Sequence, residues 1–401
     1  MRSLLCVVKR RSVDRRVDER VSVGLPSRPR EVVMSKYHKV LIIGAGKIGS
    51  AIVQLLAESG AYEVTVADKA HTFLNKLNGL DKVSTLELDV TDSNALSQAL
   101  TGQDAVVSAC SYDVSAIIAQ GALNKGCSYF DLTEDVAMTA AIKQIAINAA
   151  SGQVFMPQCG LAPGFIGILA YHLAGKFERV QSVKMRVGAL PKYPSNRMMY
   201  NLTWSTDGLI NEYCNLCEAI EHGERIDLIP LEGLECFSLD GVDYEAFNTS
   251  GGLGTLCETL QGKVEELTYK TVRYKGHQYL MQFLMQDLQL GESARRPLLK
   301  QIFETSIPIT KQDVVLIFVT VKGYRDGRLE QITDARKLYH QYRNGEHWSS
   351  IQLTTASSMC AILDLHFEGK LPDTGFLRQE DVDLELFEAN RFGQAYIKST
   401  I

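Results

Sequence analysis

A glycine-rich turn between two apolar segments constrains this chain more than any other feature. Residues 40–43, Val-Leu-Ile-Ile, form a short apolar run of the kind found in strands that are buried on both faces of a parallel sheet. The hexapeptide Gly-Ala-Gly-Lys-Ile-Gly follows at residues 44–49 with the spacing G-x-G-x-x-G, and an apolar helical start follows at residues 51–56. A strand, this turn and a helix in that order are typical of a doubly wound α/β sheet that binds a dinucleotide.

Each residue of the turn has its own physical task. Gly44 permits the tight bend, Gly46 lets the backbone approach a pyrophosphate, and Gly49 lets the helix pack against the strand. Lys47 and Ile48 begin the helix, whose N-terminal amides and dipole favour phosphate. We therefore expect these five residues to bind the cofactor.

A second segment, residues 63–68, reads as a strand that ends in Asp68. Its distance from the turn fits the ~20 residues expected before the acid that binds the adenosine ribose. Asp68 would accept hydrogen bonds from both ribose hydroxyls and repel a 2′-phosphate, so we expect NAD, with NADP as the alternative. The other interpretation is a glycine turn in a sheet that binds nothing.

The alternation of strand and helix continues to residue 156, and ligands of such sheets lie at the carboxyl ends of the strands. Asp89 and Val90 follow the strand at residues 83–88 and are expected beside the adenine. A helix cap from Thr91 or Ser93 explains the same turn equally well.

The segments that follow the fourth and fifth strands are residues 108–113 and 131–134. Both are expected to edge the nicotinamide pocket, because the strand ends meet at one edge of the sheet. Ser108 and Ser111 would then contact the cofactor.

The pattern changes beyond residue 155, where a glycine- and proline-rich corner marks a domain junction. We predict a Rossmann domain over residues 34–160 and an α+β substrate and dimerisation domain over residues 161–345. A C-terminal amphipathic helix within residues 346–401 would return to the first domain. Residues 209–222 read as another helix, inside the second domain.

Charge and composition exclude several classes of function. The net charge of −5 argues against nucleic acid, whose phosphates require a basic face. No apolar run approaches the ~18 residues of a membrane span. Nine cysteines without a clean secretory signal favour reduced thiols in a cytoplasmic protein, and the lone CxxC at residues 214–217 favours no metal. Residues 1–33 carry a net charge of +5 and are expected to be a disordered or artefactual extension.

Four further segments carry a more specific signal than the glycine-rich turn. Residues 248–260 read Asn-Thr-Ser-Gly-Gly-Leu-Gly-Thr-Leu-Cys-Glu-Thr-Leu, and residues 269–277 read Tyr-Lys-Thr-Val-Arg-Tyr-Lys-Gly-His. Residues 158–164 form a glycine- and proline-rich turn, and residues 208–213 read Gly-Leu-Ile-Asn-Glu-Tyr. These segments resemble the saccharopine dehydrogenase family, and most closely its lysine 6-dehydrogenases, whose corresponding segments read TSGG…TLPETF, YKTxRYPGH, GLxPG and GLINEY.

The likeness extends in order over residues 39–365, with two departures. Cys257 and Lys275 stand where the family has proline, which changes loop stiffness without deleting a functional group. The resemblance implies an NAD(P)-dependent oxidoreductase that acts on the carbon–nitrogen bond of a lysine-type amino acid, with an α/β second domain that forms a homodimer. Such oxidation requires a neutral nitrogen, a carbon held against the nicotinamide, and water to hydrolyse the iminium.

An amino-acid substrate also requires a cation for its carboxylate. Arg273 is the first candidate, with an ordinary structural salt bridge as the alternative. Thr249, Ser250 and the amide of Gly251 form a polar turn that can hold a carboxylate, or else cap the helix expected at residues 255–260.

Three residues are candidates for catalysis. His277 titrates near neutral pH and is placed to relay the amine proton, but it is equally placed to cap the helix starting at Gln278. Tyr112 and Asp131 would orient the reacting nitrogen. Asp131 and Thr133 have an alternative role as caps of the following helix.

Two other functions compete with the dehydrogenase. One is a reductive condensation of an amine with a carbonyl, as in carboxynorspermidine formation, which would prefer NADPH. The other is a nucleotide-sensing protein that kept the fold but lost turnover. Hydride transfer requires no protein nucleophile, so residue types alone leave the three open.

Overall fold

The glycine-rich turn joins the first strand and the first long helix of a seven-stranded parallel sheet. The computed structural model describes residues 37–343 and 345–397, so the extension expected at residues 1–33 lies outside the described residues. The sheet has the order β17-β6-β5-β4-β1-β2-β3. Its strands are β1 (His38–Ile43), β2 (Tyr62–Asp68), β3 (Val83–Glu87), β4 (Ala105–Ser108), β5 (Ser128–Asp131), β6 (Val154–Met156) and β17 (Gly375–Phe376).

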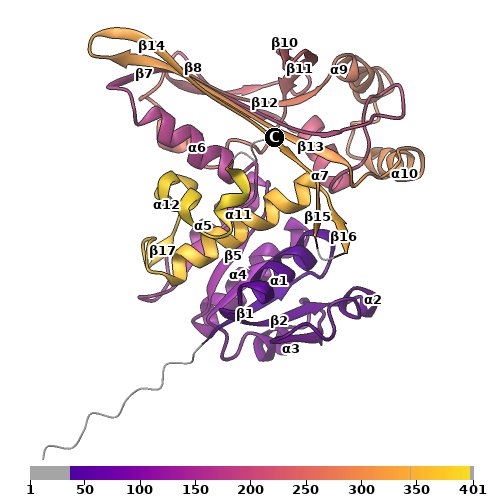
Figure 1. The fold of residues 1–401 in the computed structure, drawn as a ribbon, viewed down its shortest axis with the longest axis vertical. Helices are drawn as coiled ribbons and strands as arrows, with labels where there is room; N and C mark the ends of the chain where they lie inside the picture. The colour runs from indigo at the N-terminus through magenta and orange to yellow at the C-terminus, as the bar shows by residue number, and fades with distance from the viewer. Residues whose placement is uncertain (1–36, 344, 398–401) are drawn as a thin grey trace, which may run out of the picture. The chain divides into compact units, whose positions relative to one another are not determined.

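Helices alternate with these strands, as the glycine turn and the apolar runs predict. They are α1 (Lys47–Ser59), α2 (His71–Leu74), α3 (Ser93–Ala99), α4 (Ser115–Lys125) and α5 (Val136–Ala146), with a short turn η1 (Tyr112–Val114) before α4. The doubly wound architecture expected from the sequence is confirmed (Figure 1). β17 is the exception to the alternation, since it comes from near the end of the chain and pairs with β6.

A second sheet has eight strands in the order β10-β11-β12-β7-β13-β14, with β8 paired to β12 and to β9. These strands are β7 (Arg179–Pro191), β8 (Cys217–Glu221), β9 (Glu224–Leu228), β10 (Glu235–Leu239), β11 (Val242–Asn248), β12 (Glu266–Tyr274), β13 (Asp313–Arg325) and β14 (Arg328–Tyr339). Only the β12–β7 pair is parallel among the pairs described, so this sheet is largely antiparallel, as expected for an α+β domain. A separate small ribbon consists of β15 (Gln341–Arg343) and β16 (Glu346–Trp348).

The remaining helices accompany the second sheet or lie between the two sheets. They are α6 (Phe165–Ala174), α7 (Thr206–Cys214), α8 (Leu256–Leu260), α9 (His277–Gln282), α10 (Arg296–Ser306), α11 (Ser350–Phe367) and α12 (Leu384–Ala389). Short helical turns are η2 (Phe283–Asp287), η3 (Gln379–Asp381) and η4 (Gly393–Tyr396). No helix in the described part of the chain is long and apolar enough to cross a membrane.

Helix α11 lies in the layer between the two sheets (Figure 1). It contacts α1 and β5 of the first sheet layer and β13 of the second. Thirteen of its residues are buried, on all sides of the helix, so the amphipathic character expected for this segment is wrong. The domain boundaries near residues 160 and 345 stay predictions.

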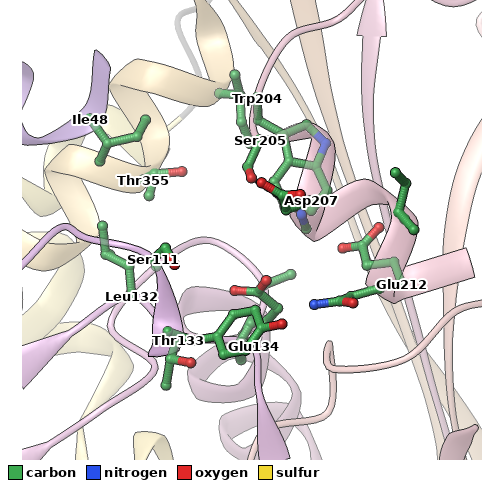
Figure 2. A pocket seen from close by; sticks show the side chains of 18 of the residues that line it. Ile48, Ser111, Leu132, Thr133, Glu134, Trp204, Ser205, Asp207, Glu212 and Thr355 are labelled. Atoms are coloured by element: carbon green, nitrogen blue, oxygen red, sulfur yellow. Dashed lines mark hydrogen bonds between the residues drawn. The ribbon is translucent and has the colours of Figure 1, made fainter. Parts of the chain in front are cut away.

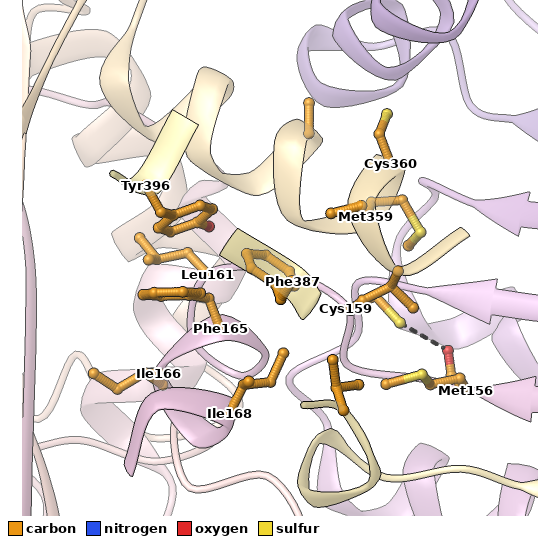
Figure 3. Packing of buried hydrophobic residues seen from close by; sticks show 14 of the residues in the cluster. Met156, Cys159, Leu161, Phe165, Ile166, Ile168, Met359, Cys360, Phe387 and Tyr396 are labelled. Carbon is orange, nitrogen blue, oxygen red and sulfur yellow. Dashed lines mark hydrogen bonds between the residues drawn. The ribbon is translucent and has the colours of Figure 1, made fainter. Parts of the chain in front are cut away.

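Aromatic and sulfur side chains fill the space beside α11 (Figure 3). The rings of Phe165 and Tyr396 stack with centroids 3.9 Å apart, and Phe387 packs against both. Met359 and Cys360 of α11 belong to the same core cluster. The core is therefore continuous from the first sheet to the helices under the second.

The helix expected over residues 209–222 is only partly present. α7 ends at Cys214, and Asn215 takes an extended conformation with φ −94° and ψ 150°. The chain then enters β8 at Cys217, so the two cysteines of the CxxC do not share a helix. A short apolar segment does not distinguish a helix from a strand, because it is too short to show either period.

The C-terminal end of α11 is tied to the first sheet by a buried carboxylate. Asp364 accepts hydrogen bonds from the Tyr62 hydroxyl on β2, from Asn390 Nδ2 (2.8 Å) and from Arg391 Nε (3.0 Å). Its side chain is 4% exposed. Burial alone would raise the pKa of Asp364, but the bonds from Arg391, Tyr62 and Asn390 hold that pKa below its ordinary value.

We expect Asp364→Asn to lower the free energy of unfolding by about 2 kcal/mol at neutral pH, because it removes charge-assisted bonds to a buried group. A folded-state pKa below the unfolded value stabilises the fold above the unfolded pKa and loses that effect as pH falls. The difference between wild type and variant in urea unfolding should therefore shrink in acid. Glu368→Gln, which removes an exposed ion pair with Lys370, is the control and should change stability by less than about 0.5 kcal/mol. Equal stability of wild type and Asp364→Asn would show that the Asp364 carboxylate does not stabilise the fold.

Candidate functional site

The turn after β1 has the shape that a pyrophosphate requires. Gly44 has φ +100°, and a Cβ there would lie 2.8 Å from the Ala109 carbonyl oxygen. A Cβ at Gly49 would lie 1.8 Å from the Gly44 oxygen, so α1 packs on the turn only because Gly49 has no side chain. At Gly46 a Cβ would meet no protein atom within 4 Å. The open space beside Gly46, at the N-terminus of α1, fits a dinucleotide phosphate.

The carboxylate of Asp68 is fixed beside this turn at the end of β2. Its Oδ2 accepts from the Ala45 amide (2.7 Å), and its Oδ1 accepts from the Ala70 amide (2.7 Å). Two backbone donors therefore hold an acceptor where the ribose of a dinucleotide would lie. The residues at this edge fit a nicotinamide dinucleotide.

A cavity of about 960 Å³ runs from the turn to the second sheet. It is lined by residues after β1, β4 and β5, by α7, by β7 and β12, and by the start of α10. Figure 2 shows Ile48 and Leu132 on one side of it and Trp204 and Glu212 on another. The cavity thus connects the dinucleotide edge with side chains of the second sheet layer.

Six of the residues predicted from the sequence line this cavity: Gly46, Lys47, Ile48, Ser111, Tyr112 and Arg273. Ser111 is exposed, and its hydroxyl bonds Asp113. Lys47 Nζ donates to the Thr203 carbonyl (2.5 Å), so the glycine-rich turn is bonded to the segment that precedes α7. Burial lowers the pKa of Lys47, an effect that Asp313 opposes.

Besides Gly44, Gly49 and Asp68, three further predicted cofactor contacts lie outside the lining: Asp89, Val90 and Ser108. Asp89 is exposed at the end of β3 and accepts from the Thr91 amide (2.9 Å) and hydroxyl (2.7 Å). Val90 follows it, and Ser108 is buried at the end of β4. The cap of α3 is Asp92, which accepts from two amides, so the alternative caps Thr91 and Ser93 are wrong.

Asp131 is buried and does not line the cavity. Its carboxylate accepts from the Tyr129 hydroxyl (2.7 Å) and from the amides of Thr133 (3.0 Å) and Gln158 (3.0 Å). Burial raises the pKa of Asp131 to about 6. The cap of α5 is Asp135, so neither Asp131 nor Thr133 caps that helix. These bonds tie the end of β5 to the segment after β6.

Arg273 lies at the deep end of the cavity and is 2% exposed. Its Nε donates to the Tyr213 hydroxyl (2.9 Å), and its Nη1 donates to the Val272 carbonyl (2.8 Å). The guanidinium lies 5.2 Å from the ring centre of Tyr200 and 5.8 Å from that of Tyr213. Within residues 37–343 and 345–397, no hydrogen bond engages Nη2, which leaves a donor for a ligand carboxylate.

His277 stands behind Arg273 rather than in the cavity. Its Nδ1 lies 2.8 Å from the Met198 carbonyl, so that nitrogen carries the proton, and its Nε2 accepts from Tyr213 (3.1 Å). Burial and the charge of Arg273 lower the pKa of His277 to about 3. His277 therefore stays neutral and orients Tyr213, which in turn receives the Arg273 Nε–H.

The polar turn of Thr249, Ser250 and Gly251 is not brought to this cavity. Ser250 donates its hydroxyl to the Asn211 carbonyl (3.1 Å) and its amide to the Glu212 carbonyl (3.0 Å). Thr249 and Gly251 line a hollow of about 10 Å³ elsewhere. The turn therefore supports the end of α7, and α8 begins after it without a side-chain cap.

Glu134 lies in the segment 131–134 that was expected to edge the pocket, and it lines the cavity, although no role was assigned to it. Sequence reasoning missed several other residues of the cavity, namely Trp204, Asp207, Asn211, Glu212, Arg296 and Lys300. Asn211 and Glu212 lie within the matched GLINEY segment, and Glu134 ends the polar run after β5. These segments were recognised in the sequence, but no function was assigned to the three side chains. Burial raises the pKa of Glu212 to about 8 and also raises the pKa of Glu134.

We expect Gly46→Ala to weaken dinucleotide binding at least about tenfold, because its methyl group would occupy the open space beside the turn. The melting temperature should change little, since no protein atom lies within 4 Å of the added carbon. Gly175→Ala, at a glycine with φ −62° after α6, is the matched control. Fluorescence titration with NAD and NADP measures the affinity. Unchanged affinity for both would show that the glycine-rich turn does not bind the dinucleotide.

Comparisons with known proteins relate this chain to one family. Residues 40–155 match the family model of the saccharopine dehydrogenase NADP binding domain, and residues 160–390 match that of the saccharopine dehydrogenase C-terminal domain. A curated relative is the NADP(+)-dependent, L-glutamate-forming saccharopine dehydrogenase of Schizosaccharomyces pombe, 25% identical over 201 residues, which are 47% of this chain and 43% of the relative. The enzyme of the same name from Pyricularia oryzae is 23% identical over 65% of this chain and 60% of its own length. The chain thus spans about half the length of the curated relatives it matches.

Two solved structures share the fold. The apo L-glutamate-forming saccharopine dehydrogenase of Saccharomyces cerevisiae superposes with a TM-score of 0.71 at 16% identity, over 90% of this chain and 96% of that one. The homospermidine synthase of Legionella pneumophila, in complex with NAD, gives 0.63 at 15% identity over 90% of each chain. Because the two family models together match most of the chain, it belongs to the saccharopine dehydrogenase family.

Proposed function

We propose that the protein oxidises a carbon–nitrogen bond of a lysine-type amino acid, such as lysine or saccharopine, with NAD as the hydride acceptor. One observation carries the proposal: a single cavity joins the glycine-rich turn to the buried guanidinium of Arg273. The names of the curated relatives support a substrate of this class. The homodimer expected from the resemblance stays a prediction.

The deep end of the cavity is suited to the charged head of an amino acid. Arg273 offers a guanidinium donor to a carboxylate, and its position is held by Tyr213 and the aromatic rings around it. Glu212 lies close enough for the two charges to interact. A cation and a carboxylate side by side match the carboxylate and ammonium of an α-amino acid.

The other end of the cavity is suited to the reacting carbon. When bound, the oxidised nicotinamide accepts the hydride that leaves this carbon. Leu132 and Ile48 line the cavity near the strand ends and narrow the access of water to the reacting carbon. Trp204 and Tyr112 provide flat apolar surface for an alkyl chain between the two ends.

We expect purified protein with NAD to oxidise L-lysine or saccharopine and to leave cadaverine, which lacks a carboxylate, almost untouched. Arg273→Lys should raise the KM for the amino acid about tenfold or more, because an ammonium cannot replace the guanidinium geometry. Absorbance of the reduced cofactor measures both effects. Arg186→Lys, which changes a cation paired with Glu235 on the second sheet, is the control.

Two outcomes would contradict the proposal. Dinucleotide binding without turnover of any amine would favour a nucleotide-sensing protein. Consumption of the reduced cofactor with an amine and a carbonyl compound, without oxidation of either amino acid, would favour the condensing enzyme. An unchanged KM in Arg273→Lys would remove Arg273 from the substrate site.

Asp68 is the reason that we expect NAD. The descriptions of the family model and of the curated relatives, in contrast, name NADP. The 2′-phosphate of NADP would meet a carboxylate held by two amides, and like charges at ~4 Å repel by ~4 kcal/mol near a protein surface. We expect wild type to prefer NAD and Asp68→Ser to shift the ratio of kcat/KM values toward NADP at least about tenfold. Glu63→Gln, an exposed carboxylate on the same strand, is the control. An equal preference in wild type and Asp68→Ser would show that Asp68 does not select the cofactor.

A further inference from the structure

Two carboxylates from different parts of the fold meet on one helix of the cavity. Glu212 lies on α7, and Gly208 lies four residues earlier, one turn along the same face. A Cβ at Gly208 would lie 3.2 Å from Glu134 Oε1 and 2.3 Å from Trp204 Cζ3. The Glu134 carboxylate, from the segment after β5, therefore rests on the first turn of α7. Residues one turn apart lie about 6 Å from each other, so Glu134 and Glu212 are neighbours in the cavity lining, with Glu134 beside Thr133 and Glu212 on the α7 side (Figure 2).

Glu212 is buried without a partner. It is 9% exposed, and in the described part of the chain no hydrogen bond or ion pair reaches its carboxylate. Arg273 attracts it electrostatically but gives its printed hydrogen bonds to Tyr213 and Val272. Because burial raises the pKa of Glu212 to about 8, the group holds a proton near neutral pH until a cation joins it in the cavity.

Glu134 is half-buried and also lacks a partner side chain among the described residues. Apart from its own backbone amide, no donor among the described residues engages its carboxylate. The charged groups around it are Asp131 and Asp135 of its own segment and Asp207 and Glu212 of α7. Asp207 is paired with Lys300 of α10 (2.6 Å), and Arg296 of the same helix, which also lines the cavity, gives its hydrogen bonds to Gly291, Asn211 and Asn215.

We propose that Glu134 and Glu212 form an amine-binding site in which Glu212 binds the ammonium of the amino-acid head beside Arg273 and Glu134 accepts the proton from the reacting nitrogen. The inference rests on the proposed function and names the proton acceptor for it. Glu134 is the acceptor of the two because it follows β5, whose carboxyl end lies at the dinucleotide edge. Glu212 lies farther into the second sheet layer, beside Arg273.

The proton transfer completes the chemistry of an amine oxidation. The ammonium R–CH₂–NH₃⁺ gives one proton to the Glu134 carboxylate, which frees the nitrogen lone pair. That lone pair forms the C=N bond as a C–H bond breaks and its electron pair leaves with the hydrogen as hydride to the oxidised dinucleotide. Water adds to the resulting iminium, and collapse of the adduct releases an aldehyde and ammonia, or a second amine when the nitrogen was secondary.

The residues first considered for this role lack its requirements. His277 is buried behind Tyr213, and its low pKa keeps it neutral with both ring nitrogens engaged. Both carboxylate oxygens of Asp131 already accept hydrogen bonds, from Tyr129, Thr133 and Gln158. Raised pKa values at Glu134 and Glu212 agree with a proton acceptor that works near neutral pH.

The test compares Glu134→Gln and Glu212→Gln with wild type, using L-lysine, saccharopine and NAD over a range of pH. We expect Glu134→Gln to lower kcat about a hundredfold or more and to abolish the acidic limb of the pH profile, because the carboxylate must be ionised to accept a proton. Glu134→Asp should recover part of the rate. Glu212→Gln should mainly raise the KM for the amine, about tenfold. Glu134→Gln and Glu212→Gln should bind NAD like wild type. The control is Glu221→Gln, which changes an exposed carboxylate on β8.

Calorimetric titration with L-lysine separates this inference from the proposed function. Binding of an ammonium ionises the carboxylate pair, so wild type should release protons near pH 7, and the variant with both glutamates replaced should not bind. If wild type binds L-lysine with proton release but oxidises no amine, the amine-binding site holds and the proposed reaction fails. A Glu134→Gln variant with wild-type kcat and pH profile would overturn the role of Glu134. Binding of L-lysine that survives replacement of both glutamates would overturn the site.

Discussion

Helix α11 is the element on which the arrangement of both sheets depends. Because it is buried along its length, its terminal backbone amides must find protein partners. At its start, the buried carboxylate of Asp313 on β13 accepts from the amides of Ser350 and Ile351. At its end, Asp364 accepts from a hydroxyl of β2. One helix is thus bonded to both sheets, and the cavity lies between elements whose spacing that helix sets.

Local sequence predicts the dinucleotide edge well because its physics is local. The steric need for Gly49 arises from Gly44 five residues earlier, and Asp68 reaches back to Ala45 through one bond. The alternation of strands and helices follows from the same short-range apolar pattern. The second sheet was predicted only by class, and the helix expected over residues 209–222 ended early because Asn215 is extended.

The substrate end could not be predicted from local patterns, because its side chains converge only in the folded chain. Glu134 and Glu212 come from separate layers, and nothing near either residue in sequence indicates that the other is close. Arg273 was found because its strand and the following Gly-His are family-like. His277 was assigned a chemical role on residue type alone, whereas burial and the hydrogen bond to Met198 make it a positioning residue for Tyr213. Prediction from sequence therefore succeeded where geometry is set within one supersecondary unit and failed where burial decides.

The strand β17 has a consequence for how the molecule is made. It closes the edge of the first sheet through bonds from Gly375 to Gln153 and from Leu377 to Phe155, both 2.9 Å. Until that late stretch of polypeptide leaves the ribosome, the newly formed edge at β6 lacks its neighbour and presents unpaired amides and carbonyls to solvent or to a chaperone. The first sheet is therefore completed only late in translation. A fragment that lacks β17 would keep an unpaired strand edge at β6 and would be prone to pair with other chains.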